Sequence, residues 1–160
     1  MSKSNLQVEL KKQRPFTTPE EEVSLNLART SDVVQEGFAR LFKQHGLSAP
    51  LYNILRTLRG EGRPLPCLEV AARMVTREPD ITRLVDRLEK KGLAIRSRTE
   101  HDRRVVLIAI TDAGRAVLAA LDRPVVALHK AQLGHLAPDE QAQLNRLLAK
   151  ARRPELQGHD

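Results

Sequence analysis

Apolar residues recur at helical spacing along most of this chain. The first such stretch runs from residue 20 to about 44, and its apolar positions are Val23, Leu27, Val34, Phe38 and Leu41. Thr18 and Pro19 precede it and three glutamates follow, which is a helix-start signal because threonine caps free N–H groups and acids favour the positive end of the helix dipole. The pattern predicts a long amphipathic helix that ends at Gly46.

Three shorter segments with an apolar face follow this helix. Ser48 and Pro50 open the first, whose apolar positions are Leu51, Ile54, Leu55 and Leu58. A second, short helix is predicted from about Cys67 to Val75. The third has apolar residues at i, i+3, i+4 and i+7, namely Ile81, Leu84, Val85 and Leu88. Its opposite face is polar and carries Thr82, Arg83, Asp86, Arg87 and Lys90.

The segment after Gly92 is predicted to be a β-hairpin. Ala94–Arg98 is a short candidate strand, and Arg104–Ile110 returns as a second strand rich in β-branched residues. The polar turn Thr99–Arg103 joins them. The hairpin is therefore expected to have a basic, exposed tip.

Two further helices complete the pattern. A cap at Thr111 opens a long helix in which Pro124 is expected to cause a kink near Asp122 or a break, because proline has no N–H to donate. The last helix begins at Pro138. Residues 1–19 are polar and basic without sustained periodicity, and we expect them to form a flexible arm. The expected fold class is mainly α with a small β-hairpin wing.

Composition narrows the classes of function. The 160 residues include 27 lysines and arginines against 20 acidic residues, a formal net charge of +7. Aromatic residues make up only 2%, which argues against proteins that stack single-stranded bases on aromatic side chains. With no apolar run of membrane length and no signal peptide, we expect a cytoplasmic protein with no membrane partner. The charge indicates a polyanionic partner but does not separate nucleic acid from a heparin-like polymer.

The residues that carry chemistry point away from catalysis and metal binding. Cys67 is the only cysteine, so an intramolecular disulfide and a cysteine-rich zinc site are excluded. We interpret it as a buried structural thiol rather than a redox switch. The five histidines show no metal-ligand spacing, and no phosphate-binding loop or nucleophile motif is present. We therefore expect no enzyme activity, no cofactor and no metal.

The order of the predicted elements is the most informative feature. A short helix, a turn, a polar-faced helix and a basic hairpin follow one another, as in a winged helix-turn-helix. Residues 73–104 hold ten basic and six acidic residues, so basic charge is concentrated where such a fold reads DNA. The helix suits the major groove, and the hairpin suits the adjacent minor groove. The alternative is a solvated helix face whose charges pair at i, i+4.

Three motif blocks occur in register around this helix and hairpin. They are Ile81–Leu93, Asp102–Val105 and Leu107–Gly114, the last ending in Ile-Thr-Asp-Ala-Gly. Together they resemble the signature of the MarR (multiple antibiotic resistance regulator) family, and the resemblance extends over residues 20–152. It implies a transcriptional regulator, more often a repressor than an activator, that binds a pseudo-palindromic duplex operator as a homodimer.

The resemblance also implies a division of the chain and a set of DNA contacts. The parts are an arm 1–19, a dimerisation helix 20–47, a DNA-binding lobe 48–111, C-terminal dimerisation helices 112–153 and a tail 154–160. The implied DNA-binding residues are Arg77, Asp80, Thr82, Arg83, Arg87, Arg96, Arg98, Asp102, Arg103 and Arg104. Among these, Arg104 would enter the minor groove, Arg103 would contact phosphate and Asp102 would orient the wing loop. The chain departs from the family pattern at Arg77–Asp80, where serines and threonines are common, and at Ala137, where a capping serine is usual.

The resemblance further suggests a small aromatic acid as an effector, because relatives release DNA on binding such ligands. The candidate effector-binding residues are Phe38, Phe42, Tyr52, Leu55, Arg87 and Arg96. The alternative is that the four apolar residues belong to the core and that the two arginines bind phosphate or Asp86. Two other functions stay open: a helical module whose basic face binds an acidic protein, and an unrecognised small-molecule enzyme. Neither explains the hairpin.

Overall fold

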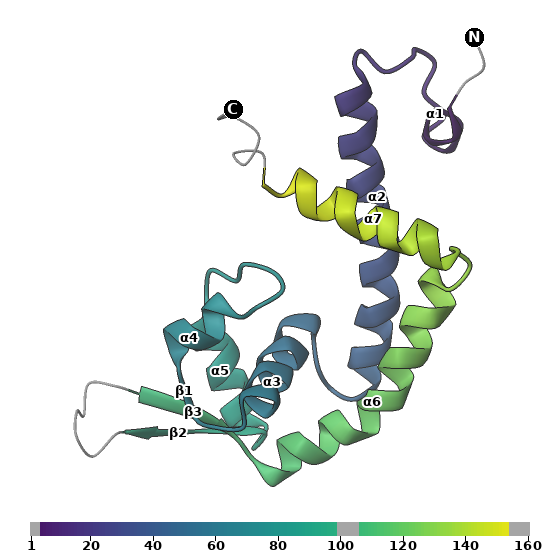
Figure 1. Ribbon diagram of the computed structural model, residues 1–160. Helices are drawn as coiled ribbons and strands as arrows, with labels where there is room; N and C mark the ends of the chain where they lie inside the picture. Colours follow the sequence, from purple (N-terminus) through teal and green to yellow (C-terminus); the bar gives the residue numbers. More distant parts are fainter. Residues whose placement is uncertain (1–3, 99–105, 154–160) are drawn as a thin grey trace.

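The computed structural model describes residues 4–98 and 106–153 (Figure 1). Its elements are α1 (Asn5–Glu9), α2 (Pro19–Gln44), α3 (Ala49–Glu61), β1 (Leu65–Pro66), α4 (Cys67–Ala72), α5 (Ile81–Lys90), β2 (Ala94–Arg98), β3 (Val106–Ile110), α6 (Asp112–Leu133) and α7 (Pro138–Ala151). A lobe made of α3, α4, α5 and the sheet lies beside an arm made of α1, α2, α7 and the second half of α6. The mainly helical fold class is confirmed. Over the described ranges no helix is long and apolar enough to cross a membrane.

The small sheet has three antiparallel strands in the order β1-β3-β2. The predicted hairpin is confirmed, since β2 pairs with β3 in a register that sets Ala94 opposite Ile110. The sequence did not predict β1, in which Leu65 lies opposite Ile108. Through β1, the segment that leads into α4 joins the same sheet as the wing strands.

The core of the lobe is built around α3, which buries six of its thirteen residues. The predicted apolar faces of α3 and α5 point inward, and their fully buried side chains include Ile54, Leu55, Val85 and Leu88. Ile108 of β3 and Leu118 of α6 join the same cluster. Each buried side chain of this size contributes about 1.5–3 kcal/mol. The core therefore holds one face of α5 and leaves its polar face at the surface.

Two of the predicted helix starts are confirmed by capping threonines. Thr18 accepts a hydrogen bond from the N–H of Glu21 at 3.2 Å, and Thr111 accepts one from the N–H of Gly114 at 3.1 Å. At the start of α7, Ala137 offers no side-chain cap, and its own N–H donates to the carboxylate of Glu140 at 2.8 Å. Glu140 thus makes the glutamate half of a capping box, and the half that a serine would make is missing.

Helix α6 runs without interruption through Pro124. Of the two predicted outcomes, a break is therefore wrong, and a kink is compatible with the continuous helix. Figure 1 shows α6 changing direction between the lobe and the arm. A bend is expected there because Pro124 cannot donate to the carbonyl of Ala120. Beyond the bend α6 packs on α2, where Nε2 of Gln132 donates to the carbonyl of Val34 at 3.0 Å.

The N-terminal segment contains a helix that the sequence did not predict. Ser4 caps α1 by accepting a hydrogen bond from the N–H of Gln7 at 3.3 Å, and Leu6 is only 3% exposed. Glu9 pairs with Arg29 of α2 at 3.0 Å. The sequence predicts that residues 1–19 are flexible. This is wrong for Asn5–Glu9, because α2 supplies contacts that local periodicity does not reveal.

Candidate nucleic-acid interface

Helix α5 presents a polar face that the core leaves free. Its inner face buries Ile81, Val85 and Leu88, whereas Thr82, Arg83, Arg87 and Lys90 are exposed. A shallow groove of about 630 Å³ follows this outer face, and it is lined by Glu78, Pro79, Asp80, Arg83, Leu84, Asp86, Arg87 and Lys90. Hydrogen-bond donors of three cationic side chains are therefore gathered along one side of a single helix.

Asp80 has a structural role at the start of α5. Its Oδ1 accepts a hydrogen bond from the N–H of Arg83 at 3.2 Å, so Asp80 is the N-cap of the helix. Its Oδ2 lies 3.3 Å from Nε of Arg83. The Arg83 side chain is nevertheless 84% exposed. Asp80 thus fixes the first turn of α5 and the base of the Arg83 side chain together.

Arg96 connects β2 to α5. Its Nη1 donates to Asp86 Oδ1 at 2.5 Å and also to a carboxylate oxygen of Glu89, while its Nη2 donates to the carbonyl of Thr82 at 3.1 Å. The backbone N–H of Arg96 donates to Glu89 Oε1 at 2.9 Å. Burial, the strongest single influence, acts to lower the pKa of Arg96, but the hydrogen bonds and charges of Asp86 and Glu89 outweigh it and raise this pKa.

The structure separates the predicted DNA-binding residues into three groups. Arg77, Thr82, Arg83, Arg87 and Arg98 are exposed on α5, on the segment before it or at the end of β2. Asp80 and Arg96 are engaged within the protein. Asp102, Arg103 and Arg104 lie outside the described residues.

The candidate effector-binding residues form an aromatic cluster at the junction of α2 and α3. The rings of Phe38 and Phe42 lie 5.8 Å apart, and those of Phe42 and Tyr52 are stacked at 4.2 Å. Leu55 is fully buried, and none of the three aromatic residues is more than 9% exposed. These contacts favour the core interpretation of the four side chains. Arg87 and Arg96 belong to α5 and β2 instead.

Two arginines close to this aromatic cluster, Arg56 and Arg59, were not among the residues predicted from the sequence. Burial raises the pKa of Tyr52, and Arg56 and Arg59 are the cations that work against this rise. Both follow Tyr52 on α3 at i+4 and i+7, a spacing that could have identified them. Arg59 also forms a double hydrogen bond with Asp122 of α6.

Cys67 and His129 both pack against other side chains of the protein. Cys67 is half-buried and packs against the edge of the core, so it is less enclosed than the predicted buried thiol. His129 is exposed at the surface of α6, and its ring lies 4.7 Å from that of Phe38. In the part of the chain that the structure describes, no group of three or more His, Cys, Asp or Glu residues could hold a metal ion.

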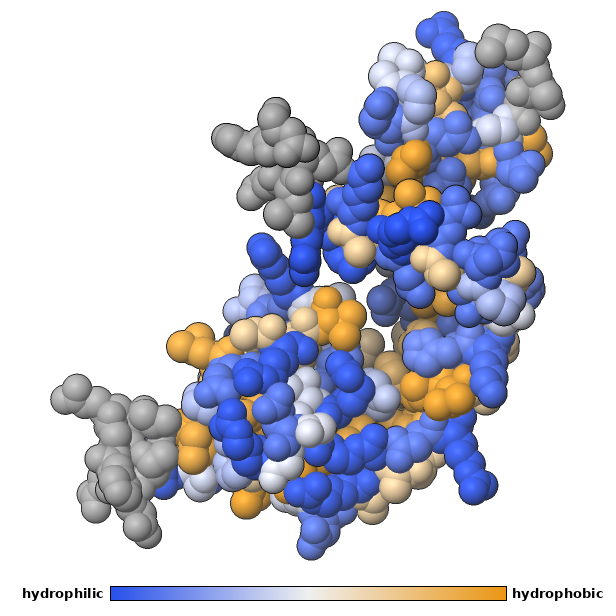
Figure 2. Space-filling view, viewed as in Figure 1, coloured by the Kyte–Doolittle hydropathy of each residue, from blue (hydrophilic) through white to orange (hydrophobic). Residues whose placement is uncertain are grey.

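The arm exposes apolar side chains that the protein itself does not cover. Helix α7 buries none of its residues, and the 26-residue α2 buries only Phe38 and Phe42. The large apolar side chains exposed on these helices and on α6 are Val23, Leu25, Leu27, Val33, Val126, Leu133, Leu144 and Leu147. Figure 2 shows hydrophobic surface between hydrophilic residues where α2 and α7 cross.

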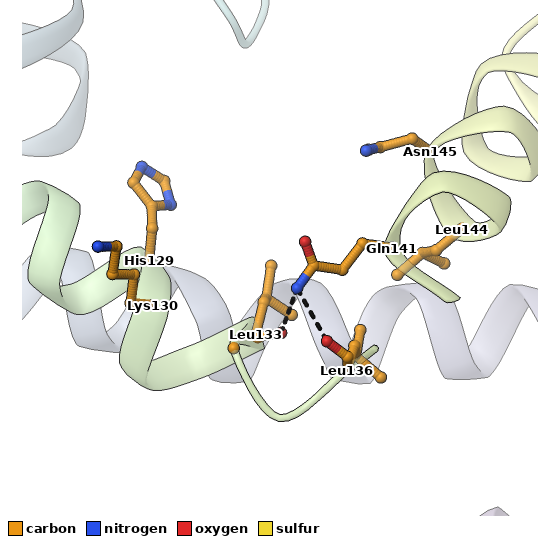
Figure 3. A pocket seen from close by; sticks show the side chains of 8 residues that line it. His129, Lys130, Leu133, Leu136, Gln141, Leu144 and Asn145 are labelled. Atoms are coloured by element: carbon orange, nitrogen blue, oxygen red, sulfur yellow. Dashed lines mark hydrogen bonds between the residues drawn. The ribbon is translucent and has the colours of Figure 1, made fainter. Parts of the chain in front are cut away.

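A cleft of about 280 Å³ lies between α6 and α7 (Figure 3). It is lined by His129, Lys130, Leu133, Gly134, Leu136, Gln141, Leu144 and Asn145. Gln141 closes the turn between the two helices, because its Nε2 donates to the carbonyls of Leu133 at 3.3 Å and Leu136 at 3.0 Å. The cleft continues the exposed apolar surface of the arm through Leu133 and Leu144.

This chain is similar to known regulators along most of its length. A family model described as MarR family matches residues 47–106. The uncharacterised HTH-type transcriptional regulator YkoM of Bacillus subtilis (strain 168) is 33% identical over 141 residues, which cover 85% of this chain and 90% of that protein. The HTH-type transcriptional regulator PecS of Dickeya dadantii (strain 3937) is 33% identical over 127 residues, 78% of this chain and 76% of that protein.

A solved structure shows the same arrangement of elements. The crystal structure of a MarR transcription factor from Planctomyces limnophilus is 44% identical to this chain and superposes with a TM-score of 0.65. The match covers 84% of this chain and 98% of that one. The similarity therefore includes the helices of the arm as well as the winged lobe.

Proposed function

Because the chain belongs to the MarR family, whose members are transcription factors and not enzymes, we propose that it represses transcription by binding a pseudo-palindromic duplex operator as a homodimer. The outer face of α5 carries this proposal: Thr82, Arg83 and Arg87 stand exposed on a helix whose opposite face is anchored in the core. A helix of 10 residues is about 15 Å long, and the major groove, about 12 Å wide, accepts it.

Each exposed side chain has a role in this proposal. Arg83 and Arg87 offer the forked donors that pair with guanine, and the Thr82 hydroxyl suits several bases. Arg77 and Arg98 flank α5 and would contact phosphates, which add affinity without sequence preference. The resemblance assigns Asp102, Arg103 and Arg104 to the tip of the wing, with Arg104 in the minor groove.

The exposed apolar side chains of α2, α6 and α7 support the proposed homodimer. Exposed leucines and valines on α2, α6 and α7 would remain in contact with water in a single chain, although burial of each contributes about 1.5–3 kcal/mol. A second copy offers the same helices, and its arm would fill the cleft beside Leu133 and Leu144. A two-fold dimer would place its two α5 helices about one turn of DNA, roughly 34 Å, apart. Occupying both half-sites would exclude other proteins from that DNA, which is the proposed basis of repression.

A gel-shift titration tests this function. The duplexes are fragments of the DNA that flanks the protein's own gene, and the competitors are random duplex and heparin. We expect a retarded complex that resists random duplex and contains two protein chains. Equal binding to operator fragments, random duplex and heparin would instead support a basic module that binds acidic proteins or polymers.

We also propose that a small aromatic acid lowers operator affinity by binding at the junction of α2 and α3. The rings of Phe42 and Tyr52 are stacked and almost fully buried, so such an acid would bind by opening this packed cluster, with Arg56 and Arg59 as the nearby cations. A carboxylate beside these arginines would complete the apolar, singly charged site that such acids need. Hydroxybenzoic acids should raise the melting temperature of the wild type more than that of Arg56→Gln. Equal shifts in the two proteins, or none, would contradict this site.

A further inference from the structure

We propose that Arg96 is a positioning residue for DNA recognition: it locks the wing strand β2 onto α5 and pairs with two carboxylates of that helix, and it makes no contact with DNA. The proposal rests on the proposed operator binding and differs from the role in DNA contact or effector binding that the sequence suggested. In this role Arg96 sets the orientation of the wing relative to α5.

Most of the side-chain donors of Arg96 are already used within the protein. A guanidinium has five N–H donors, two on each terminal nitrogen and one on Nε. Both donors of Nη1 are used by Asp86 and Glu89, and Nη2 donates to the carbonyl of Thr82 at 3.1 Å. The side chain is 27% exposed, far less than the 84% of Arg83. Three of the five donors are therefore committed within the protein, and the two that remain belong to a side chain that is mostly covered.

The contacts of Arg96 span the whole of α5. They reach Thr82 in the first turn, Asp86 in the middle and Glu89 in the last turn. The backbone N–H of Arg96 adds a fourth bond, to Glu89 at 2.9 Å. Since β2 pairs with β3, this single residue fixes the direction of the wing strands against the helix axis. The flat, forked guanidinium can make these bonds at once, whereas a lysine ammonium lacks this geometry.

The charge of Arg96 matters as much as its geometry. Residues 80–91 carry four basic and three acidic side chains, so α5 alone is almost balanced in charge. Asp86 lines the same outer groove as Arg83, Arg87 and Lys90. Left unpaired, its carboxylate would face the DNA phosphates and oppose binding. Arg96, which lies on β2, supplies a positive charge that offsets the carboxylates of Asp86 and Glu89. Arg83, Arg87 and Lys90 therefore remain free to bind DNA.

The experiment compares Arg96→Gln with the triple variant Arg96→Gln/Asp86→Asn/Glu89→Gln, which removes the carboxylates along with the cation. Operator affinity is measured by fluorescence anisotropy over a range of salt concentrations. We expect Arg96→Gln to weaken binding about tenfold or more. The triple variant should recover the part of this loss that comes from the unpaired carboxylates, with the salt slope of the wild type. A triple variant as weak as Arg96→Gln would overturn the role of Arg96 in compensating the carboxylates, and a salt slope smaller by about one in both variants would indicate direct phosphate contact.

Arg98→Gln is the matched control, since Arg98 is exposed on the same strand two residues further on. Its loss of affinity should persist when Asp86→Asn and Glu89→Gln are added, with a salt slope smaller by about one. A second readout needs no DNA: amide exchange in β2 should be faster in Arg96→Gln than in the wild type or Arg98→Gln. Unchanged exchange would overturn the locking role. A wild type that binds no operator would instead contradict the proposed function while leaving the exchange result decisive for the lock.

Discussion

Arg59 of α3 and Asp122 of α6 are joined by two parallel hydrogen bonds, 3.0 Å from Nη1 to Oδ2 and 2.6 Å from Nη2 to Oδ1. Asp122 stands two residues before Pro124, where α6 lacks a backbone hydrogen bond and bends. The pair therefore ties the last turn of α3 in the lobe to the point where α6 turns into the arm. It is a fixed link between the DNA-binding lobe and the proposed dimerisation helices.

The first prediction concerns the pH dependence of this link. Hydrogen bonds from Arg59 hold the pKa of Asp122 below its ordinary value of 3.8. Because the folded-state pKa is lowered, the ionised carboxylate stabilises the fold at neutral pH, and this stabilisation is lost as the pH falls below about 4. We expect Asp122→Asn to lower the melting temperature at pH 7 by at most about 2 to 4 °C, since both side chains are partly exposed.

Melting curves of the wild type and Asp122→Asn from pH 7 to pH 3 measure this effect. The difference between the two proteins should shrink toward zero at the acid end. Glu36→Gln is the control, because Glu36 forms an exposed i,i+4 pair with Arg40 within α2 alone. A difference for Asp122→Asn that stays constant with pH would contradict the assigned pKa shift.

The second prediction concerns the turn into α6. A Cβ added at Gly114 would lie 2.3 Å from the carbonyl oxygen of Leu93 and 2.8 Å from Cγ1 of Ile110, and backbone cannot move aside cheaply. Gly114→Ala should therefore destabilise the protein by about 1–3 kcal/mol or more, seen as a lower urea midpoint. Ala113→Gly on the exposed side of the same turn is the control, with an expected loss of about 1 kcal/mol. Equal midpoints for Gly114→Ala and the wild type would refute the close packing at Leu93.

The third prediction concerns assembly. Leu147 is 51% exposed on α7, which buries nothing within its own chain. Leu147→Glu should give a monomer in analytical ultracentrifugation at concentrations where the wild type is a dimer, because a carboxylate would be buried unpaired in the interface. Leu68→Glu, on a leucine 84% exposed on α4 in the lobe, should leave the dimer intact. A dimeric Leu147→Glu would move the interface away from α7.

The amphipathic helices of this fold could be predicted from the sequence, because their spacing is a local property. Two elements could not. The strand β1 has only two residues and no periodicity. It forms because Leu65 pairs with Ile108 of β3, more than forty residues away in the sequence. Helix α1 has five residues, too few to be stable alone, and the Glu9–Arg29 pair holds it to α2.

The candidate site shows the same division between local and non-local information. The exposed positions of Arg83 and Arg87 follow from the helical period of α5. The role of Arg96 does not, because its partners Asp86 and Glu89 lie on another element and only the fold brings them together. Asp80 is an intermediate case: an aspartate directly before an apolar helix pattern is a capping signal that the sequence already contained.

The fourth prediction assigns base contact to Arg83. Its side chain is exposed on α5, and Arg83→Ala should weaken operator binding by about 1–3 kcal/mol while affinity for random duplex falls less. The fold should be unaffected, because the Arg83 side chain is 84% exposed. Arg40→Ala, at an exposed arginine of α2, is the matched control and should leave operator affinity unchanged. Equal losses for operator and random duplex would assign Arg83 to phosphate.

The most direct test of DNA recognition by this winged lobe is the operator dissociation constant measured at a series of salt concentrations, beside the same series for random duplex. We expect two steep straight lines of log affinity against log salt, since each phosphate contact adds about 0.9 to the slope, with the operator line well above the other. A flat line, or one line shared by operator and random duplex, would contradict DNA recognition by the winged lobe.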